Sequence, residues 1–148
     1  MAYLTPRLPD IQKSGPTIQV QIFPSSARVK NIQQDEITDD DKTPVIAQMM
    51  IDTGASSSVI SVGVADRLGL VQHGVGTIST PSTGKSGHSC PIFDVDLYLP
   101  TLEKKIRNLR VMESDLTAQQ IDGLIGRDVL RDGLLVYSGR DNTFSLAL

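Results

Sequence analysis

The chain has 148 residues, a formal net charge of −3 and a hydrophobic fraction of 39%. This length suits one domain with a sizeable core, and the mildly acidic balance gives no electrostatic reason to expect nucleic acid or an anionic membrane as a partner. The only cysteine, Cys90, excludes an intrachain disulfide. Because no segment resembles a secretory signal or reaches the ~18–20 apolar residues of a membrane span, we expect a cytoplasmic protein or a piece of a longer one.

The first residues differ in character from the rest of the chain. Residues 1–15 are polar and interrupted by prolines, so we interpret them as an N-terminal tail or edge segment before one domain over residues 16–148. Within that domain, apolar side chains recur at every second position, which is typical of half-buried β-strands. We expect such strands at 18–22, 45–51, 93–99, 109–111 and 144–148.

Turns and short helices separate these strands. Gly, Pro, Ser and Asn predict turns at 24–26, 74–76, 81–84 and 140–142. The acidic segment 33–42 lacks an apolar pattern and is expected to be a loop, and helices are expected at 62–68 and 128–132, each followed by glycine. Many short strands with polar turns predict a small all-β barrel or sandwich.

A short polar motif follows the strand expected at 45–51. Asp52 comes directly after it, and the next residues are Thr53, Gly54 and Ala55. An aspartate there emerges from a buried strand into a tight turn, beside a hydroxyl. Gly54 permits unusual backbone angles and the close approach of another chain, and Ala55 leaves the floor of a cleft open.

A second motif lies near the C-terminus. Leu124, Ile125 and Gly126 are followed by Arg127 and Asp128, ahead of the second expected helix. Asp52-Thr53-Gly54-Ala55 followed by this segment resembles the retropepsin-type aspartic proteases, over roughly residues 16–148. The resemblance implies a small closed β-barrel with one or two short helices that forms a homodimer and needs no cofactor and no metal.

The resemblance also implies roles for individual residues. Asp52 matches the catalytic aspartate, Thr53 the threonine that braces the two active-site loops across the dimer, and Gly54 the glycine beside the substrate backbone. A β-hairpin flap is expected over residues 77–88. The remaining substrate contacts implied by the resemblance are Ala55, Ser56, Pro81, Ser82, Thr83 and Gly84.

The sequence departs from the viral enzymes at two places. They carry an acidic residue where this chain has Ser56, and that acid pairs with the arginine corresponding to Arg127. The expected flap also lacks their glycine-rich tip. These differences point to a cellular relative and leave open both the partner of Arg127 and the cleavage preference.

The number of Asp-Thr-Gly motifs predicts the assembly. Aspartic proteases use two carboxylates that share a proton, because two close like charges resist joint ionisation. The chain has a single Asp-Thr-Gly and no Asp-Ser-Gly, so a complete site requires a second copy across a two-fold axis. The alternating residues 143–148 are expected to form an exposed edge strand that pairs with its symmetry mate.

Other interpretations were weighed for these residues. Asp52 on its own is compatible with a turn residue, and Gly84-Lys85-Ser86 lacks the upstream glycine of a phosphate-binding loop. The acids of 35–41 lack the spacing and central glycine of a calcium loop. His73, His88 and Cys90 lack a fourth metal ligand at suitable spacing, and Cys90 is expected to be a buried small residue.

The sequence therefore predicts an aspartic endopeptidase that acts on a polypeptide substrate. A dimerisation or peptide-binding module of the same fold, with little or no proteolysis, is the alternative, because fold does not dictate activity. A third possibility is a protease domain that mainly cuts its own precursor.

Overall fold

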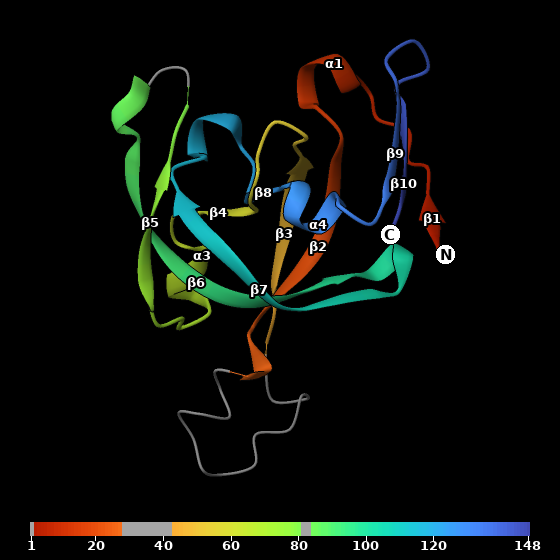
Figure 1. The fold of residues 1–148 in the computed structure, drawn as a ribbon. Coiled ribbons are helices and arrows are strands. Elements are labelled where there is room, and N and C mark those ends of the chain that lie inside the picture. Colours follow the sequence, from red (N-terminus) through yellow and green to blue (C-terminus); the bar gives the residue numbers. More distant parts are fainter. Residues whose placement is uncertain (1, 28–42, 81–83) are drawn as a thin grey trace.

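The computed structural model describes residues 2–27, 43–80 and 84–148 (Figure 1). The expected loop at 33–42 and the expected flap residues Pro81, Ser82 and Thr83 lie outside the described residues. The strands are β1 (Tyr3–Leu4), β2 (Thr17–Pro24), β3 (Val45–Ile51), β4 (Val59–Ser61), β5 (Gly74–Ile78), β6 (His88–Leu99), β7 (Lys104–Ser114), β8 (Gly123–Ile125), β9 (Leu134–Ser138) and β10 (Thr143–Ala147). The α-helices are α1 (Ile11–Ser14), α3 (Val64–Arg67) and α4 (Arg127–Leu130), and the 3₁₀ turns are η2 (Gly84–Ser86), η3 (Pro100–Leu102) and η4 (Thr117–Gln119).

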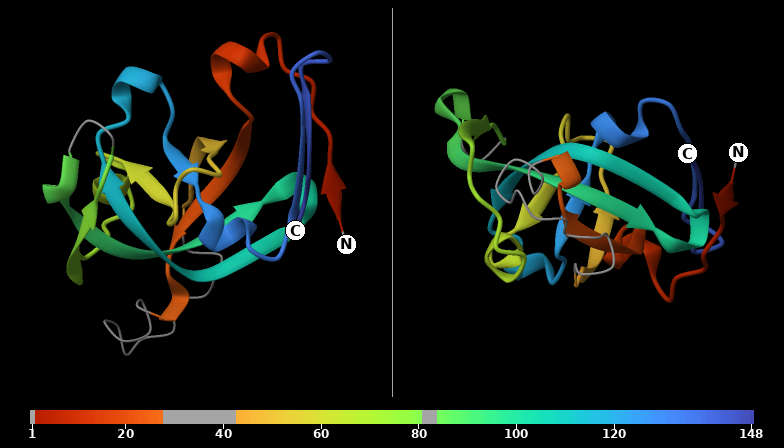
Figure 2. Two further views of the ribbon diagram at one scale, coloured as in Figure 1. Left: turned by 45° about the horizontal axis from the view of Figure 1, so that its top comes forward. Right: turned by 90° about the horizontal axis from the view of Figure 1, so that it is seen from below.

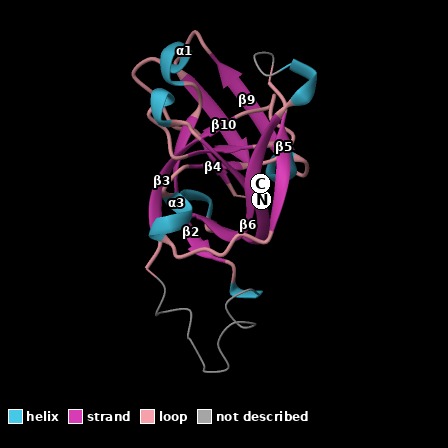
Figure 3. Ribbon diagram, turned by 90° about the vertical axis from the view of Figure 1, so that its left-hand side faces the viewer, coloured by secondary structure: helices cyan, strands magenta, loops and turns pink. Residues whose placement is uncertain are grey.

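Six strands close into a barrel. Their hydrogen-bonded order is β2-β3-β8-β4-β7-β6, and a further pairing of β2 with β6 completes the ring, while β5 extends the sheet from β6. Within this sheet, β3 is parallel to β8 and β4 is parallel to β7. The other pairs of adjacent strands are antiparallel. Figure 3 shows the short helices at the periphery of these strands. The predicted all-β closed barrel is therefore confirmed.

The core consists of the inward-facing positions of these strands. Aliphatic side chains dominate it, as expected for a chain with only 4% aromatic residues. Burial alternates along β2, β3 and β10, because successive strand residues point to opposite faces. The positions with 1% exposure or less on β2, β3 and β6 are Val20, Ile22, Ala47, Met49, Val95, Leu97 and Leu99.

A separate three-stranded sheet, which we call the terminal sheet, has the order β1-β10-β9. Both chain ends lie beside it (Figures 1 and 2). Strand β10 pairs with β9 on one side and with β1 on the other, and Phe144 and Leu146 are buried at 1% and 0% exposure. The expected exposed edge at 143–148 is therefore wrong, because β1 and β9 occupy both sides of this strand.

Two further sequence expectations need correction. The segment Gly74–Gly76 is not a turn, since it begins β5 and pairs in register with Cys90–Ile92 of β6. Glycine is favoured at Gly76 because a Cβ there would lie 2.9 Å from the sulfur of Met112. Strand β9 has no counterpart among the expected strands, and its residues Leu134, Val136 and Tyr137 are exposed, so it shows no regular alternation.

The two expected helices are present but shorter than predicted. Helix α3 has four residues in place of the expected 62–68, and α4 begins one residue before the expected 128–132 and ends at Leu130. A helix of four residues is not stable by itself. Tertiary packing stabilises both, through the buried Val64 and Ala65 of α3 and the buried Val129 of α4. Within the described ranges, no helix has the length and apolar character that crossing a membrane requires.

Candidate active site

Asp52 stands directly after β3, at the point where that strand leaves the sheet. The parallel register places Ile51 beside Ile125 of β8, and the Asp52 N–H donates to the Ile125 carbonyl at 2.9 Å. Parallel pairing therefore brings together two motifs that are about seventy residues apart, because Gly126 and Arg127 follow β8 at the same end of the sheet.

The segment 52–57, which we call the Asp52 loop, fixes its own carboxylate. Asp52 Oδ1 accepts a hydrogen bond from the Gly54 N–H at 2.8 Å, and the Asp52 carbonyl accepts one from the Ala55 N–H at 3.2 Å. A Cβ at position 54 would lie 3.0 Å from Oδ1, so glycine leaves room for this bond. Asp52 is half-buried, whereas Thr53 and Gly54 are exposed at the tip of the loop.

Arg127 braces the Asp52 loop from the side of α4. Its Nη1 donates to the carbonyls of Thr53 at 2.7 Å and Gly54 at 3.0 Å, and its main-chain N–H donates to the Ala55 carbonyl at 3.0 Å. Hydrogen bonds from a charged donor are stronger than neutral ones. The partner of Arg127, which the sequence left open, is thus the main chain of the loop that carries Asp52.

Ser58 and Asp128 close the other end of the Asp52 loop. The Ser58 N–H and hydroxyl donate to the two oxygens of the Asp128 carboxylate. The same hydroxyl accepts a hydrogen bond from the Gly126 N–H at 3.1 Å. A Cβ at Gly126 would lie 2.6 Å from the carbonyl carbon of Ser57, so this close approach of two main chains requires glycine.

The expected flap corresponds to the hairpin of β5 and β6. The last ladder pair joins Ile78 to His88, and η2 lies within the connecting segment. Gly84 and Gly87 both have positive φ, and a Cβ at Gly87 would lie 2.3 Å from the Cγ2 of Thr77. Figure 1 shows this hairpin and the loop after β3 rising on the same side of the barrel.

Cys90 of this hairpin and Glu113 of β7 interact electrostatically, and both have shifted pKa values. Burial raises the pKa of Glu113 above its ordinary value, and the Asp66 carboxylate adds to the rise. Burial also raises the pKa of the Cys90 thiol, so this side chain lacks the thiolate character of a nucleophile. Cys90 is 3% exposed, in agreement with the packing role expected for it.

His73 lies at the base of the same hairpin. Its Nε2 is 2.9 Å from Asp94 Oδ1, although the ring N–H does not form a well-directed hydrogen bond. Among the described residues, no group of three or more histidine, cysteine, aspartate or glutamate side chains is arranged to hold a metal ion.

The structure brings some of the predicted site residues together and leaves others apart. Asp52 to Ser56 share one loop, with Ala55 half-buried and Ser56 exposed, whereas Gly84 lies in the hairpin. Sequence reasoning missed Ser58 altogether, because a single serine after the motif carries no distinguishing signal. Asp128 was predicted as part of the second motif and as a helix start but without a partner, and its bonds to Ser58 depend on the pairing of β4 with β8.

A comparison with models of known protein families shows to which family this chain belongs. The family model described as aspartyl protease matches residues 36–129, which is more than half of the chain. The chain belongs to the aspartyl protease family. No curated protein matches it by sequence.

Solved structures of retropepsin-like proteases resemble this member of the family. A retropepsin-like aspartic protease from Rickettsia conorii has 13% identity and a TM-score of 0.53, with 99% of this chain and 93% of that chain covered. EIAV protease complexed with the inhibitor HBY-793 has 22% identity, 79% and 86% coverage and a TM-score of 0.45. The retroviral protease-like domain of Ddi1 from Leishmania major has 16% identity, 83% and 82% coverage and a TM-score of 0.42. At such identities, the likeness to the Rickettsia conorii structure concerns the fold.

Proposed function

We propose that this protein is a homodimeric aspartic endopeptidase in which Asp52 of each copy supplies one of two catalytic carboxylates, with residues 16–148 as the protease domain. The observation that carries the proposal is the placement of Asp52. Its carboxylate is oriented by the Gly54 N–H, on a loop that Arg127 clamps from the side. Such preorganisation suits a group that must hold and move a proton at a fixed position.

A second copy is needed because one chain carries one Asp-Thr-Gly motif. Thr53 and Gly54 are exposed at the tip of the Asp52 loop, where the equivalent loop of a partner has access to them. A two-fold axis through this region would place the two Asp52 carboxylates side by side, and each protomer would contribute the same surface.

The terminal sheet offers an apolar face for this dimer, with residues 1–15 as its edge segment. Its outward side exposes Tyr3 by 75%, Leu134 by 61% and Val136 by 53%. A shallow hollow of about 310 Å³ lies on the same face, between Tyr3, Leu134 and Ala147. Clustered exposed apolar side chains mark interaction sites, and we assign this face to the contact between copies. The contact between copies does not pair the edges of β10, because β1 occupies one edge and β9 the other.

The chemistry follows from two carboxylates that share one proton. The ionised carboxylate takes a proton from water, which attacks the scissile carbonyl, while the protonated one donates a hydrogen bond to the carbonyl oxygen. The resulting tetrahedral intermediate is not bonded to the enzyme. In this proposal the β5–β6 hairpin covers the substrate. We assign the substrate contacts to Ala55, Ser56, Pro81, Ser82, Thr83 and Gly84.

The test compares wild type with Asp52→Asn on a diverse peptide library at pH ~3.5–7, near and above the ordinary pKa of aspartate. Mass spectrometry reads the products, and Asp132→Asn, at an exposed position, serves as the matched control. Cleavage by wild type and control but not by Asp52→Asn is the expected result. Excess Asp52→Asn protein should also inhibit wild type by forming mixed dimers. A confirmed dimer without cleavage would indicate a binding module.

A further inference from the structure

Strand β2 has an open edge over its first residues. It pairs with β3 along Thr17–Ile22, but with β6 only along Gln21–Pro24. Continuing the β2–β6 register would place Gln19 opposite Pro100, which has no N–H to donate. The ladder therefore ends at Gln21, and no strand among the described residues pairs with the start of β2 on that side.

The hydrogen-bond pattern shows which main-chain groups point to the open edge. The Ile51 N–H donates to the Pro16 carbonyl, whereas the Asp52 N–H donates to β8, so alternate residues of β3 face β2. In an antiparallel ladder the opposing residues alternate in the same way. Ile18 therefore bonds to β3, and the N–H and C=O groups of Thr17 and Gln19 point away from it.

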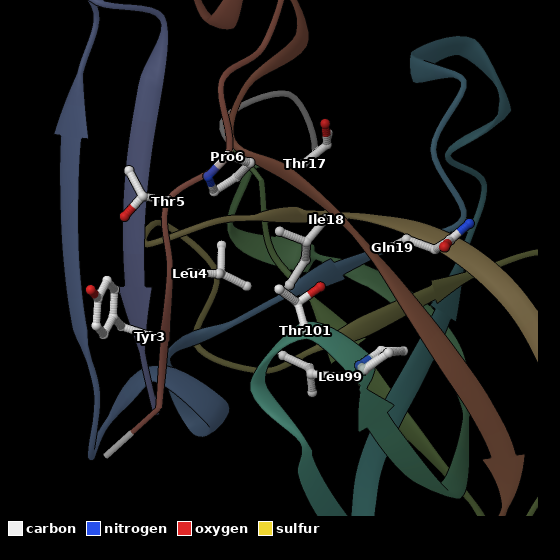
Figure 4. A pocket seen from close by; sticks show the side chains of 10 residues that line it. Tyr3, Leu4, Thr5, Pro6, Thr17, Ile18, Gln19, Leu99 and Thr101 are labelled. Carbon is white, nitrogen blue, oxygen red and sulfur yellow. The ribbon is translucent and has the colours of Figure 1, made fainter.

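A groove lies beside this open edge. It has a volume of about 510 Å³ and is bounded by β1, the start of β2 and η3. Figure 4 shows Leu4, Ile18, Leu99 and Thr101 near the middle of the view, among the side chains that line the groove. The described residues that line it are Tyr3, Leu4, Thr5, Pro6, Thr17, Ile18, Gln19, Leu99, Pro100 and Thr101, none of which is charged.

We propose that this groove binds an extended, uncharged segment of a partner polypeptide, which adds as a strand to Thr17–Gln19. An extended main chain presents N–H and C=O groups every second residue, about 6.6–6.8 Å apart, and this spacing matches the alternate free groups of β2. Its apolar side chains enter the groove toward Leu4, Ile18 and Leu99. The uncharged lining favours a segment of alternating apolar and small polar residues.

The groove is distinct from the proposed catalytic site. None of the described residues of the Asp52 loop or of the expected flap at 77–88 lines it, so the segment docks without being presented for cleavage. The inference does not depend on proteolysis, and it is tested on Asp52→Asn protein. Failure of peptide binding and failure of the proposed activity are therefore separate results.

The probe is the capped hexapeptide acetyl-TVTVTV-amide, titrated into ¹⁵N-labelled full-chain Asp52→Asn protein. The amide signals of Thr17, Gln19 and Thr101 should shift, and a statine-type inhibitor of aspartic proteases should not displace the peptide. N-methylation of alternate peptide nitrogens should weaken binding at least tenfold in one register and little in the other, because only one set of N–H groups faces β2. Equal effects in both registers, shifts confined to the Asp52 loop, or no shift at millimolar peptide would overturn the proposal.

Two variants locate the interaction. Gln19→Pro removes the N–H that points into the groove and preserves the ladder to β3, so affinity should fall about five- to tenfold, as for one lost hydrogen bond. Thr101→Trp should block the groove and abolish binding, whereas Val71→Trp, at a position 65% exposed elsewhere, should not. Thermal unfolding checks that each variant is folded. If Gln19→Pro does not fold, the comparison of Thr101→Trp with Val71→Trp decides the outcome. Unchanged affinity in Thr101→Trp would place the peptide elsewhere.

Discussion

Asp128 holds Ser58 through two hydrogen bonds, with Oδ2 accepting from the Ser58 N–H and Oδ1 from the Ser58 hydroxyl, each at 2.8 Å. Ser58 is fully buried, at 0% exposure, and its hydroxyl also accepts from the Gly126 N–H. One carboxylate at the start of α4 therefore fixes both the end of the Asp52 loop and the segment that carries Arg127.

Replacing this carboxylate should destabilise the protein. Asp128→Ala leaves the buried N–H of Ser58 and its hydroxyl without their acceptor, and each unsatisfied group costs about 1–3 kcal/mol. We expect the free energy of unfolding to fall by about 2–4 kcal/mol, measured by urea denaturation. Asp132→Ala is the control, because this side chain is 85% exposed and pairs with the exposed Arg131, and exposed pairs contribute about 0–1 kcal/mol. Similar losses in both variants would contradict the role of Asp128.

Arg127 should affect catalysis more than stability. Arg127→Gln loses the charged donor to the carbonyls of Thr53 and Gly54, so the Asp52 loop is less firmly positioned. Misplacement of about 1 Å can cost on the order of a hundredfold in rate, and we expect kcat to fall by about ten- to a hundredfold with little change in KM. Arg131→Gln, at an exposed position, should leave both unchanged. A rise in KM with kcat unchanged would instead indicate that Arg127 contacts the substrate.

The proposed dimer face can be tested with a buried charge. Val136 lies on the exposed side of the terminal sheet, opposite Ser145 of β10. Val136→Asp would place an unpaired carboxylate in the contact, at a cost of several kcal/mol, and should weaken dimerisation by about a hundredfold or more. Sedimentation velocity over a dilution series measures this, with Val71→Asp as control. An intact dimer in Val136→Asp would locate the contact on another surface.

Glu113 should make stability depend on pH. Its pKa in the folded protein is raised above the ordinary 4.5 by burial and by Asp66, so the unfolded chain ionises first as pH rises. The contribution of Glu113 to folding stability is thus greatest below pH 4.5 and falls as pH rises through the raised pKa. Glu113→Gln should therefore raise the thermal midpoint at pH 7 but not at pH 3.5, and Glu103→Gln, at an exposed turn position, should not. An equal rise at both pH values would indicate a packing effect.

Local patterns in the sequence predicted a large part of this fold. The alternation along β2, β3 and residues 93–99 of β6 was sufficient, because each has one face in the core. The aspartyl protease family was likewise evident from two short motifs, because each depends on residue types at a few consecutive positions.

Other elements lack a local signal. Strand β8 has three residues, of which the first is Gly123, and Gly126 follows it. Strand β9 has apolar side chains on both faces, so neither strand shows a clean period. The beginning of β5 was mistaken for a turn because its glycines have a strong preference for turns, whereas the close approach of Met112 favours glycine at Gly76.

The sequence by itself determined the barrel class, the family and the position of Asp52, since these depend on residue type and spacing along one stretch of chain. Only the tertiary structure decided the partner of Arg127, the bonds between Ser58 and Asp128, the central place of β10 and the open edge of β2. Each of these depends on pairing between segments far apart in the chain, and strand register at long range is set by the joint packing of the whole barrel.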